Sequence, residues 1–180
     1  EYDRARTDFR AALGHFESMG NRHGMASVHN NLGRLSMMEG DRDRAFEEHG
    51  EALKLSKEID DMQEMGVALK SLGSLAMYKG ETDQARSEYL RAMEVFRRIG
   101  DTQGVSRIRN NLGVLEMRAG QLNSALSHFM ESHKLKKQMG DMKGLISVSD
   151  NLGDLWAAKG DTGRARKAYL EAIEVAERIG

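Results

Sequence analysis

The strongest constraint on the fold is a pattern that recurs every 40 residues along the 180-residue chain. A Leu-Gly pair is followed by a second glycine seven residues later and by an alanine five residues after that. The pairs are Leu32-Gly33, Leu72-Gly73, Leu112-Gly113 and Leu152-Gly153. Self-similarity at a fixed period of this size is typical of a solenoid, in which each repeat buries its apolar face against its neighbours.

Each period contains the signals for two helices. In the first period they cover residues 22–39 and 42–59, with Gly40 between them, where a helix end favours a positive φ. An apolar stripe at steps of three and four residues predicts a further helix over residues 1–20. Pairs that end one helix and cap the next follow the second helices, as at Gly20-Asn21, whereas at Asp60 an aspartate takes the place of the glycine. Further caps are expected at Asp41, Asp61, Asp101, Asp141 and Asp161, and poorer ones at Glu81 and Gln121.

These signals predict one all-α array of nine helices with almost no strand. The array consists of a lone second helix over residues 1–20 and four full repeats at residues 21–60, 61–100, 101–140 and 141–180. The complete absence of proline agrees with nearly continuous helix.

Small residues inside the helices predict where they pack closely. Glycine inside a helix costs about 1 kcal/mol relative to alanine, so its recurrence in the first helix of every repeat needs a packing reason. We expect the second helix to approach these glycines at its alanines, Ala45, Ala85, Ala125 and Ala165. A bulky residue follows four positions later in each repeat, at His49, Tyr89, Phe129 and Tyr169.

The combined pattern resembles the tetratricopeptide repeat over the whole chain. Two features depart from the usual form of that family, namely the longer period and the absence of proline after the second helix. The proline-free, 40-residue variety is similar to the repeats of Pins-type spindle-orientation adaptors and of sensor arrays in bacterial multidomain regulators. The resemblance implies a right-handed superhelix of antiparallel helix pairs, with the first helices lining its concave groove.

The resemblance also implies a site for a protein partner in that groove. The inward positions of the first helices are those turned away from Leu32, Gly33 and their equivalents, and they include Ser27, Val67 and Ser71. The partner-binding candidates at these positions are Asn30, Asn31, Arg34, Met37, Lys70, Ser74, Met77, Tyr78, Arg107, Asn110, Asn111, Val114, Met117, Arg118, Asp150, Asn151 and Asp154.

Three properties of this face favour binding, and each has a plainer explanation. Recurrent asparagines such as Asn111 offer amides to a peptide backbone, or they satisfy neighbouring helices. Recurrent methionines such as Met77 adapt to a partner, or they fill gaps between helices. Basic residues precede the acidic Asp150 and Asp154, which describes a graded groove or a solvated surface. A carboxylate clamp is poorly matched, because Ser74 stands where that clamp has asparagine.

The sequence carries no motif for catalysis, a cofactor or a metal. The histidines form no ligand set, and the residue at the aromatic position, His49, is expected in the core. The net charge of -1 lacks the basic footprint of a nucleic-acid binder, and no apolar run reaches the length of a membrane span. We therefore expect no enzyme activity, no cofactor, no nucleic acid and no membrane.

We predict a cytoplasmic scaffold that binds a peptide or helical segment of another protein in the groove. A sensor module of a larger signalling protein and a self-associating structural array are the alternatives. The ends of the array carry no polar caps, since Phe9 and Leu13 near one end and Tyr169 and Ile173 near the other lie on apolar stripes. These surfaces favour head-to-tail self-association.

Overall fold

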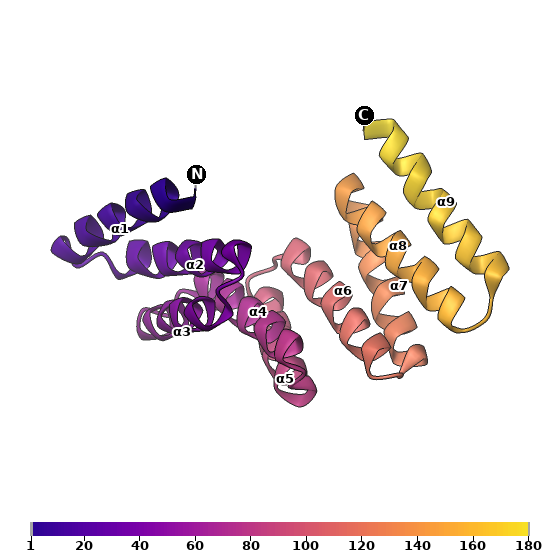
Figure 1. Cartoon of the computed structure of the whole chain (residues 1–180), viewed down its shortest axis with the longest axis horizontal. Coiled ribbons are helices and arrows are strands. Elements are labelled where there is room, and N and C mark those ends of the chain that lie inside the picture. The colour runs from indigo at the N-terminus through magenta and orange to yellow at the C-terminus, as the bar shows by residue number, and fades with distance from the viewer. Residues whose placement is uncertain (1, 180) are drawn as a thin grey trace. The chain divides into compact units, whose positions relative to one another are not determined.

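The structure of the chain is a computed structural model that describes residues 2–179 (Figure 1). Over these residues it contains nine α-helices and no strand, which confirms the all-α prediction. The helices are α1 (Tyr2–Ser18), α2 (Arg22–Glu39), α3 (Arg42–Glu58), α4 (Met62–Lys79), α5 (Thr82–Arg98), α6 (Thr102–Arg118), α7 (Leu122–Met139), α8 (Met142–Ala158) and α9 (Thr162–Ile179).

The turns between helices have the chemistry expected from the sequence. Every glycine at a helix end has a positive φ, as at Gly40 (83°), and Asp60 adopts the same region at 55°. The side chains of Asn21, Asp41, Asp61, Asp101 and Asp141 each accept a hydrogen bond from a backbone N–H of the following helix. Glu81 and Gln121 make no such bond, as their lower capping preference predicts.

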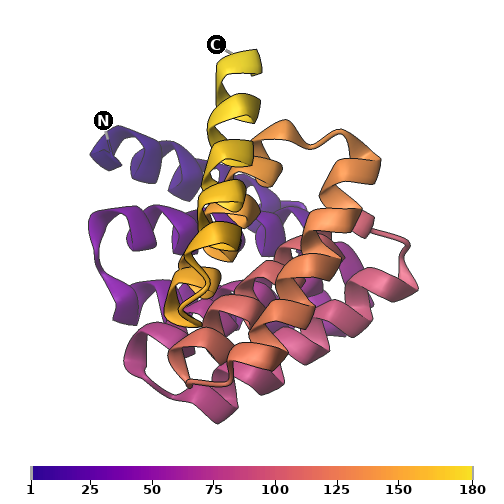
Figure 2. The same cartoon turned by 90° about the vertical axis from the view of Figure 1, so that its right-hand side faces the viewer.

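The helices pack mainly as consecutive pairs, α2 with α3, α4 with α5, α6 with α7, and α8 with α9. The chain divides into two compact units, residues 1–99 and residues 100–180. In the first unit α1 packs on α2 and α3 packs on α4; in the second, α7 packs on α8. Figure 2 shows α8 and α9 of the second unit in orange and yellow. The predicted division into a lone helix and four repeats agrees in number with these helices and stays a prediction.

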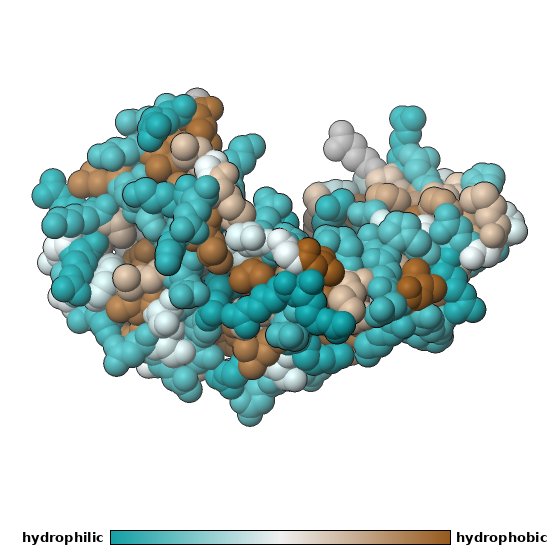
Figure 3. Space-filling model, turned by 180° about the vertical axis from the view of Figure 1, so that it is seen from behind, coloured by the Kyte–Doolittle hydropathy of each residue, from teal (hydrophilic) through white to brown (hydrophobic). Residues whose placement is uncertain are grey.

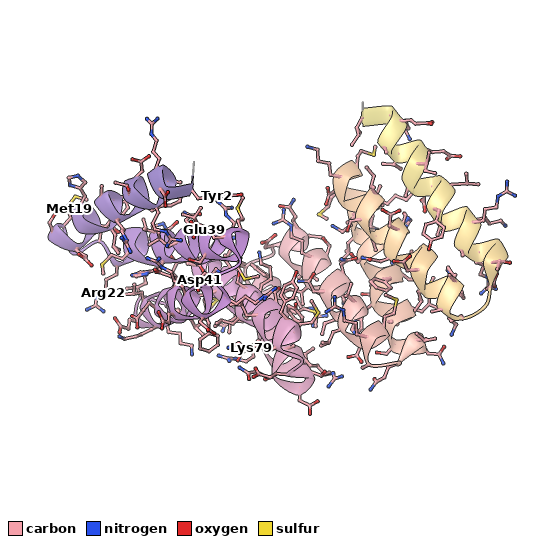
Figure 4. The ribbon with its side chains drawn as sticks, viewed as in Figure 1. Tyr2, Met19, Arg22, Glu39, Asp41 and Lys79 are labelled. Atoms are coloured by element: carbon pink, nitrogen blue, oxygen red, sulfur yellow. The ribbon has the colours of Figure 1, made fainter. Side chains whose placement is uncertain are left out.

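The helices α1 and α2 of the first unit show in which direction neighbouring helices run. Met19 and Arg22 lie at the turn between α1 and α2, whereas Tyr2 and Glu39 lie at the opposite ends of these helices (Figure 4). The two helices are therefore antiparallel. The guanidinium of the buried Arg6 on α1 forms an ion pair with Glu39, which ties the two helices together.

The glycine in the first helix of each pair makes room for a ring. A Cβ atom added at Gly33 would lie 2.7 Å from Nε2 of His49, and one added at Gly113 would lie 2.5 Å from Cδ1 of Phe129. Tyr89 lies in the same way against Gly73, and Tyr169 against Gly153. The predicted approach of an alanine is seen at Ala85, whose carbonyl oxygen would lie 3.3 Å from a Cβ at Gly73, but the nearest atoms at all four glycines belong to the ring. The alanines are buried, but the ring four residues further along requires the glycine.

Candidate functional site

A pocket of about 420 Å³ opens in the first unit between α2 and α4. Its volume lies within the roughly 300–1,000 Å³ of ordinary ligand clefts. The lining residues are Ser27, Asn30, Asn31, Arg34 and Met37 from α2, His49 from α3, and Glu64, Val67, Lys70, Ser71 and Ser74 from α4. Helical steps of three and four residues bring the α2 and α4 residues onto one face of each helix.

A hydrogen-bond chain forms the floor of this pocket. Nδ1 of His49 lies 3.0 Å from Oδ1 of Asn30, and Nδ2 of Asn30 donates to the Glu64 carbonyl at 3.1 Å and to its carboxylate at 2.8 Å. Because Oδ1 of Asn30 can only accept, Nδ1 of His49 carries the proton. The chain joins three successive helices, α3, α2 and α4.

His49 is neutral at ordinary pH. Its side chain is 1% exposed, and burial lowers its pKa to about 4, with the charge of Lys70 acting in the same direction and that of Glu48 against it. The floor of the pocket is therefore an uncharged imidazole, and the cationic groups on the pocket wall are those of Arg34 and Lys70.

The candidate residues of the first unit differ in their exposure and in their contacts within the protein. Asn30 is only 5% exposed, and its amide is taken up by His49 and Glu64, so it supports the floor from below. Asn31 is half-buried and accepts a hydrogen bond from the exposed Arg34 at 3.2 Å. One side of Met37 packs against the core cluster of Ala45 and its neighbours.

Three further candidates on α4 have other contacts. The hydroxyl of Ser74 lies 3.1 Å from that of Tyr89, so this pocket residue also partners the buried ring. Met77 and Tyr78 do not line the pocket. Tyr78 is 55% exposed, and the guanidinium of Arg42 lies 5.2 Å from the centre of its ring.

In the second unit, the candidates lie on α6 and α8. Arg107, Arg118, Asp150 and Asp154 are exposed, whereas Asn110, Asn111, Val114, Met117 and Asn151 are half-buried. Nδ2 of Asn151 donates to Oδ1 of Asn110 at 3.0 Å, which joins the two helices. Several polar groups of this face are therefore already engaged within the protein.

Three of these candidates contact the core or a tyrosine ring. Val114 and Met117 pack against the core cluster that contains Phe129. The hydroxyl of Tyr169 donates to Asp154 at 2.7 Å, and this hydrogen bond is the main cause that raises the pKa of Tyr169.

The pocket also contains two residues that sequence reasoning did not place there. His49 was assigned to the core, which is correct, but its ring also forms part of the floor. Glu64 was not considered, although it continues the helical series of Val67 and Ser71 by one step of three residues. Extending the inward stripe to the first turn of α4 would have found it.

The described residues give no sign of two other kinds of site. Between residues 2 and 179, no three or more acidic or histidine side chains gather as they would around a metal ion. None of the helices α1–α9 combines the length and the apolar character required to cross a membrane.

Comparison with known proteins finds a family model that matches part of the chain. The family model for the tetratricopeptide repeat matches residues 64–138. No curated protein matches the chain in sequence.

Solved structures share the fold. The crystal structure of BtubC (BKLC) from P. vanneervenii is 22% identical with a TM-score of 0.86, and the match covers 99% of this chain and 74% of that one. MamA is 21% identical with a TM-score of 0.68, over 97% of this chain and 92% of its own.

A Rap protein is also similar. The Rap conjugation gene regulator of plasmid pLS20 in complex with the Phr* peptide is 18% identical, with a TM-score of 0.73, over 99% of this chain and 51% of that one. The chain thus spans about half the length of that regulator. The 40-residue pattern, the nine helices of the described residues and the family match over residues 64–138 agree on the fold, which is that of a tetratricopeptide repeat solenoid.

Proposed function

We propose that the protein is an interaction scaffold and that the pocket between α2 and α4 receives a peptide segment of a protein partner. The observation that carries this proposal is the pocket itself, because α2 and α4, the first helices of two neighbouring pairs, both contribute to its walls. Scaffolds of repeat proteins use such continuous faces to bind other proteins.

The chemistry of the pocket suits a peptide that carries an acidic group. Arg34 and Lys70 supply positive charge, Asn31 and Ser71 supply hydrogen-bonding groups for a backbone, and Val67 adds an apolar contact. The similar Rap regulator was solved in complex with a peptide, which supports a peptide as the ligand class. We extend the proposal to the α6 and α8 candidates of the second unit, including Asn111 and Arg107.

The proposal is tested by selecting peptides from a random display library against the purified protein and measuring their affinity. Val67→Glu fills the pocket and places a negative charge there without removing a hydrogen bond of its floor, so the selected peptides should lose most of their affinity. Ser87→Glu, at an exposed site on α5 outside the pocket, is the matched control and should bind normally. Equal binding by both variants would reject the pocket as the site.

A regulatory sensor module is the second candidate. The observation that favours it is the similarity to the Rap conjugation gene regulator and to the apo form of RapI, which has a TM-score of 0.75 at 14% identity over 63% of its own length. Free peptides that bind tightly while no protein partner is captured would favour the sensor. Capture of a protein through the selected sequence would favour the scaffold. The cytoplasmic location remains a prediction from the sequence.

A further inference from the structure

A second pocket, of about 530 Å³, lies in the second unit between α7, α8 and α9. Its apolar lining consists of Leu126 and Met130 from α7 and Leu152 and Trp156 from α8. None of these residues belongs to the partner-binding candidates. An apolar pocket of this size with a few polar groups at its edge is the usual form of a small-molecule site.

One lining residue of this pocket, Trp156, is specific to the last repeat. The positions that correspond to Trp156 at the 40-residue spacing are Ser36, Ala76 and Glu116, and all three are buried. A tryptophan is too large for that space, so its ring remains half-buried and becomes a wall of the pocket. Trp156 is also the single tryptophan of the chain.

Cationic groups surround the apolar lining. An adjoining pocket shares Leu152, Trp156 and Glu171, and adds Arg164 and Lys167 from α9. The Arg164 guanidinium lies 4.6 Å from the centre of the Trp156 ring. Lys134 lines the apolar pocket from α7. Among the described residues, neither Lys134 nor Lys167 forms a salt bridge.

The acidic groups of the pocket already have partners. Glu171 accepts hydrogen bonds from Nε2 of His133 at 3.0 Å and from the Ser149 hydroxyl at 3.2 Å. Glu131 forms a salt bridge with Arg109 at 3.3 Å. Lys134 and Lys167 are therefore the charges that remain available to a ligand, whereas Arg164 already pairs with Asp161 at 3.4 Å.

We propose that the α7–α9 pocket binds an amphipathic organic anion. The apolar body of this ligand lies against Leu126, Met130 and Trp156. Its acidic group is held by Lys167, with Arg164 beside it on the Trp156 ring and Lys134 adding positive charge from α7.

The experiment uses two probes that differ by one anionic group, 1-anilinonaphthalene-8-sulfonate and the neutral N-phenyl-1-naphthylamine. Titration of the intact protein with the sulfonate should saturate and should show energy transfer from Trp156, because the bound probe lies against this ring. The neutral probe should bind more weakly. An absence of energy transfer, or equal binding of the two probes, would overturn the proposal.

Two double variants isolate the role of charge. Lys134→Gln with Lys167→Gln should weaken binding of the sulfonate about three-fold or more, as expected for losing partly exposed charges. The matched control is Lys54→Gln with Lys143→Gln, which removes two exposed lysines outside the pocket, and it should bind like the unmodified protein. Equal affinity of the two double variants would overturn the proposal.

A third pair of variants tests the apolar wall. Trp156→Ala should abolish most of the increase in probe emission, and circular dichroism reports whether this variant is folded. Met130→Glu alters a residue that is 58% exposed, so it leaves the core intact, and its negative charge in the apolar lining should also exclude the anionic probe. Unchanged binding by Met130→Glu would place the probe elsewhere and overturn the proposal.

Discussion

At the residue scale, one position on the first helix of a pair is matched in polarity to the ring that it meets on the second helix. Where the ring on the second helix carries a hydroxyl, a polar side chain on the first helix meets it, as Ser74 meets Tyr89 and Asp154 meets Tyr169. Where the ring is Phe129, the corresponding residue is Val114. At Tyr89, which is fully buried, the matching follows from the cost of burying an unpaired hydroxyl.

This matching predicts a coupling between Phe129 and Val114. Phe129→Tyr alone should lower the free energy of unfolding by about 1–3 kcal/mol, because it places a hydroxyl beside an apolar residue in a fully buried position. Adding Val114→Ser should give a favourable coupling energy of about 1 kcal/mol in a double-mutant cycle measured by urea denaturation. Strictly additive effects would show that the two side chains do not meet.

The buried imidazole of His49 predicts a pH dependence of stability. Its pKa is about 4 in the folded protein and 6.5 as the ordinary value, so the unfolded chain binds more protons between these limits. Stability contributed by this group is complete above pH 6.5 and is lost as the pH falls towards 4, by on the order of 3 kcal/mol.

Denaturation by urea at about pH 7 and about pH 4.5 measures this effect. His49→Phe is the control, since it removes the titrating group and should flatten the pH dependence even though it leaves Asn30 without its donor. The same slope in both proteins would assign the pH dependence to other groups.

At the element scale, substituting alanine for two glycines inside helices should change the free energy of unfolding in opposite directions. Gly113→Ala should lower the free energy of unfolding by about 1–3 kcal/mol, because the new Cβ would lie 2.5 Å from the Phe129 ring. Gly50→Ala should raise it by about 0.5–1 kcal/mol, because nothing lies within 4 Å of that Cβ and alanine favours the helix. Thermal unfolding of the two variants checks the contrast, and a stabilised Gly113→Ala would contradict the ring contact.

The turn at Asp60 offers a stabilising substitution. Its φ of 55° lies in the region that glycine occupies at Gly20, Gly100 and Gly140, and an L-residue is strained there. Asp60→Gly should therefore raise the free energy of unfolding by about 1 kcal/mol. Gly100→Asp, at a corresponding turn, should lower it by a similar amount. A destabilised Asp60→Gly would mean that the aspartate side chain makes a compensating interaction.

Helix number and boundaries could be predicted from the sequence because they depend on local chemistry. The expected helix over residues 22–39 coincides with α2, and α3 ends one residue before its expected end at residue 59. The capping aspartates and the positive-φ glycines determine these ends through interactions with residues only a few positions away in the sequence. The contact partner of Gly113 could not be predicted, because it depends on how far the Phe129 ring reaches between the helices.

At the scale of the whole molecule, the candidate site was predictable only as a helix face. Residues such as Ser27, Val67 and Ser71 share the inward face and line the pocket. Met77 and Tyr78 do not line the pocket, and Asn30 is buried. Both outcomes depend on contacts with other helices, which the pattern of a single helix does not contain. Hydrophilic residues cover most of the face shown in Figure 3, with smaller apolar areas between them, so polarity alone does not distinguish a site.

Some of the exposed apolar residues bear on self-association. Tyr2 on α1 is 45% exposed, and Leu170 and Ile173 on α9 are 44% and 52% exposed. The residue that corresponds to Ile173 on α5 is Met93, which is only 6% exposed, so this position is normally a packing position. An uncovered packing face on α9 and an uncovered apolar side chain on α1 favour contact between copies of this chain.

The last prediction is concentration-dependent head-to-tail association of the 180-residue chain. Such a contact joins different surfaces of two copies, so it need not close, and the mean mass should rise with concentration in sedimentation or light scattering. Ile173→Lys should suppress the association, because it places a charge on the apolar face of α9. Met38→Lys changes a similarly exposed apolar residue on α2 and should leave the association unchanged. A monomer at all concentrations, or equal suppression by both variants, would reject a contact through the face of α9.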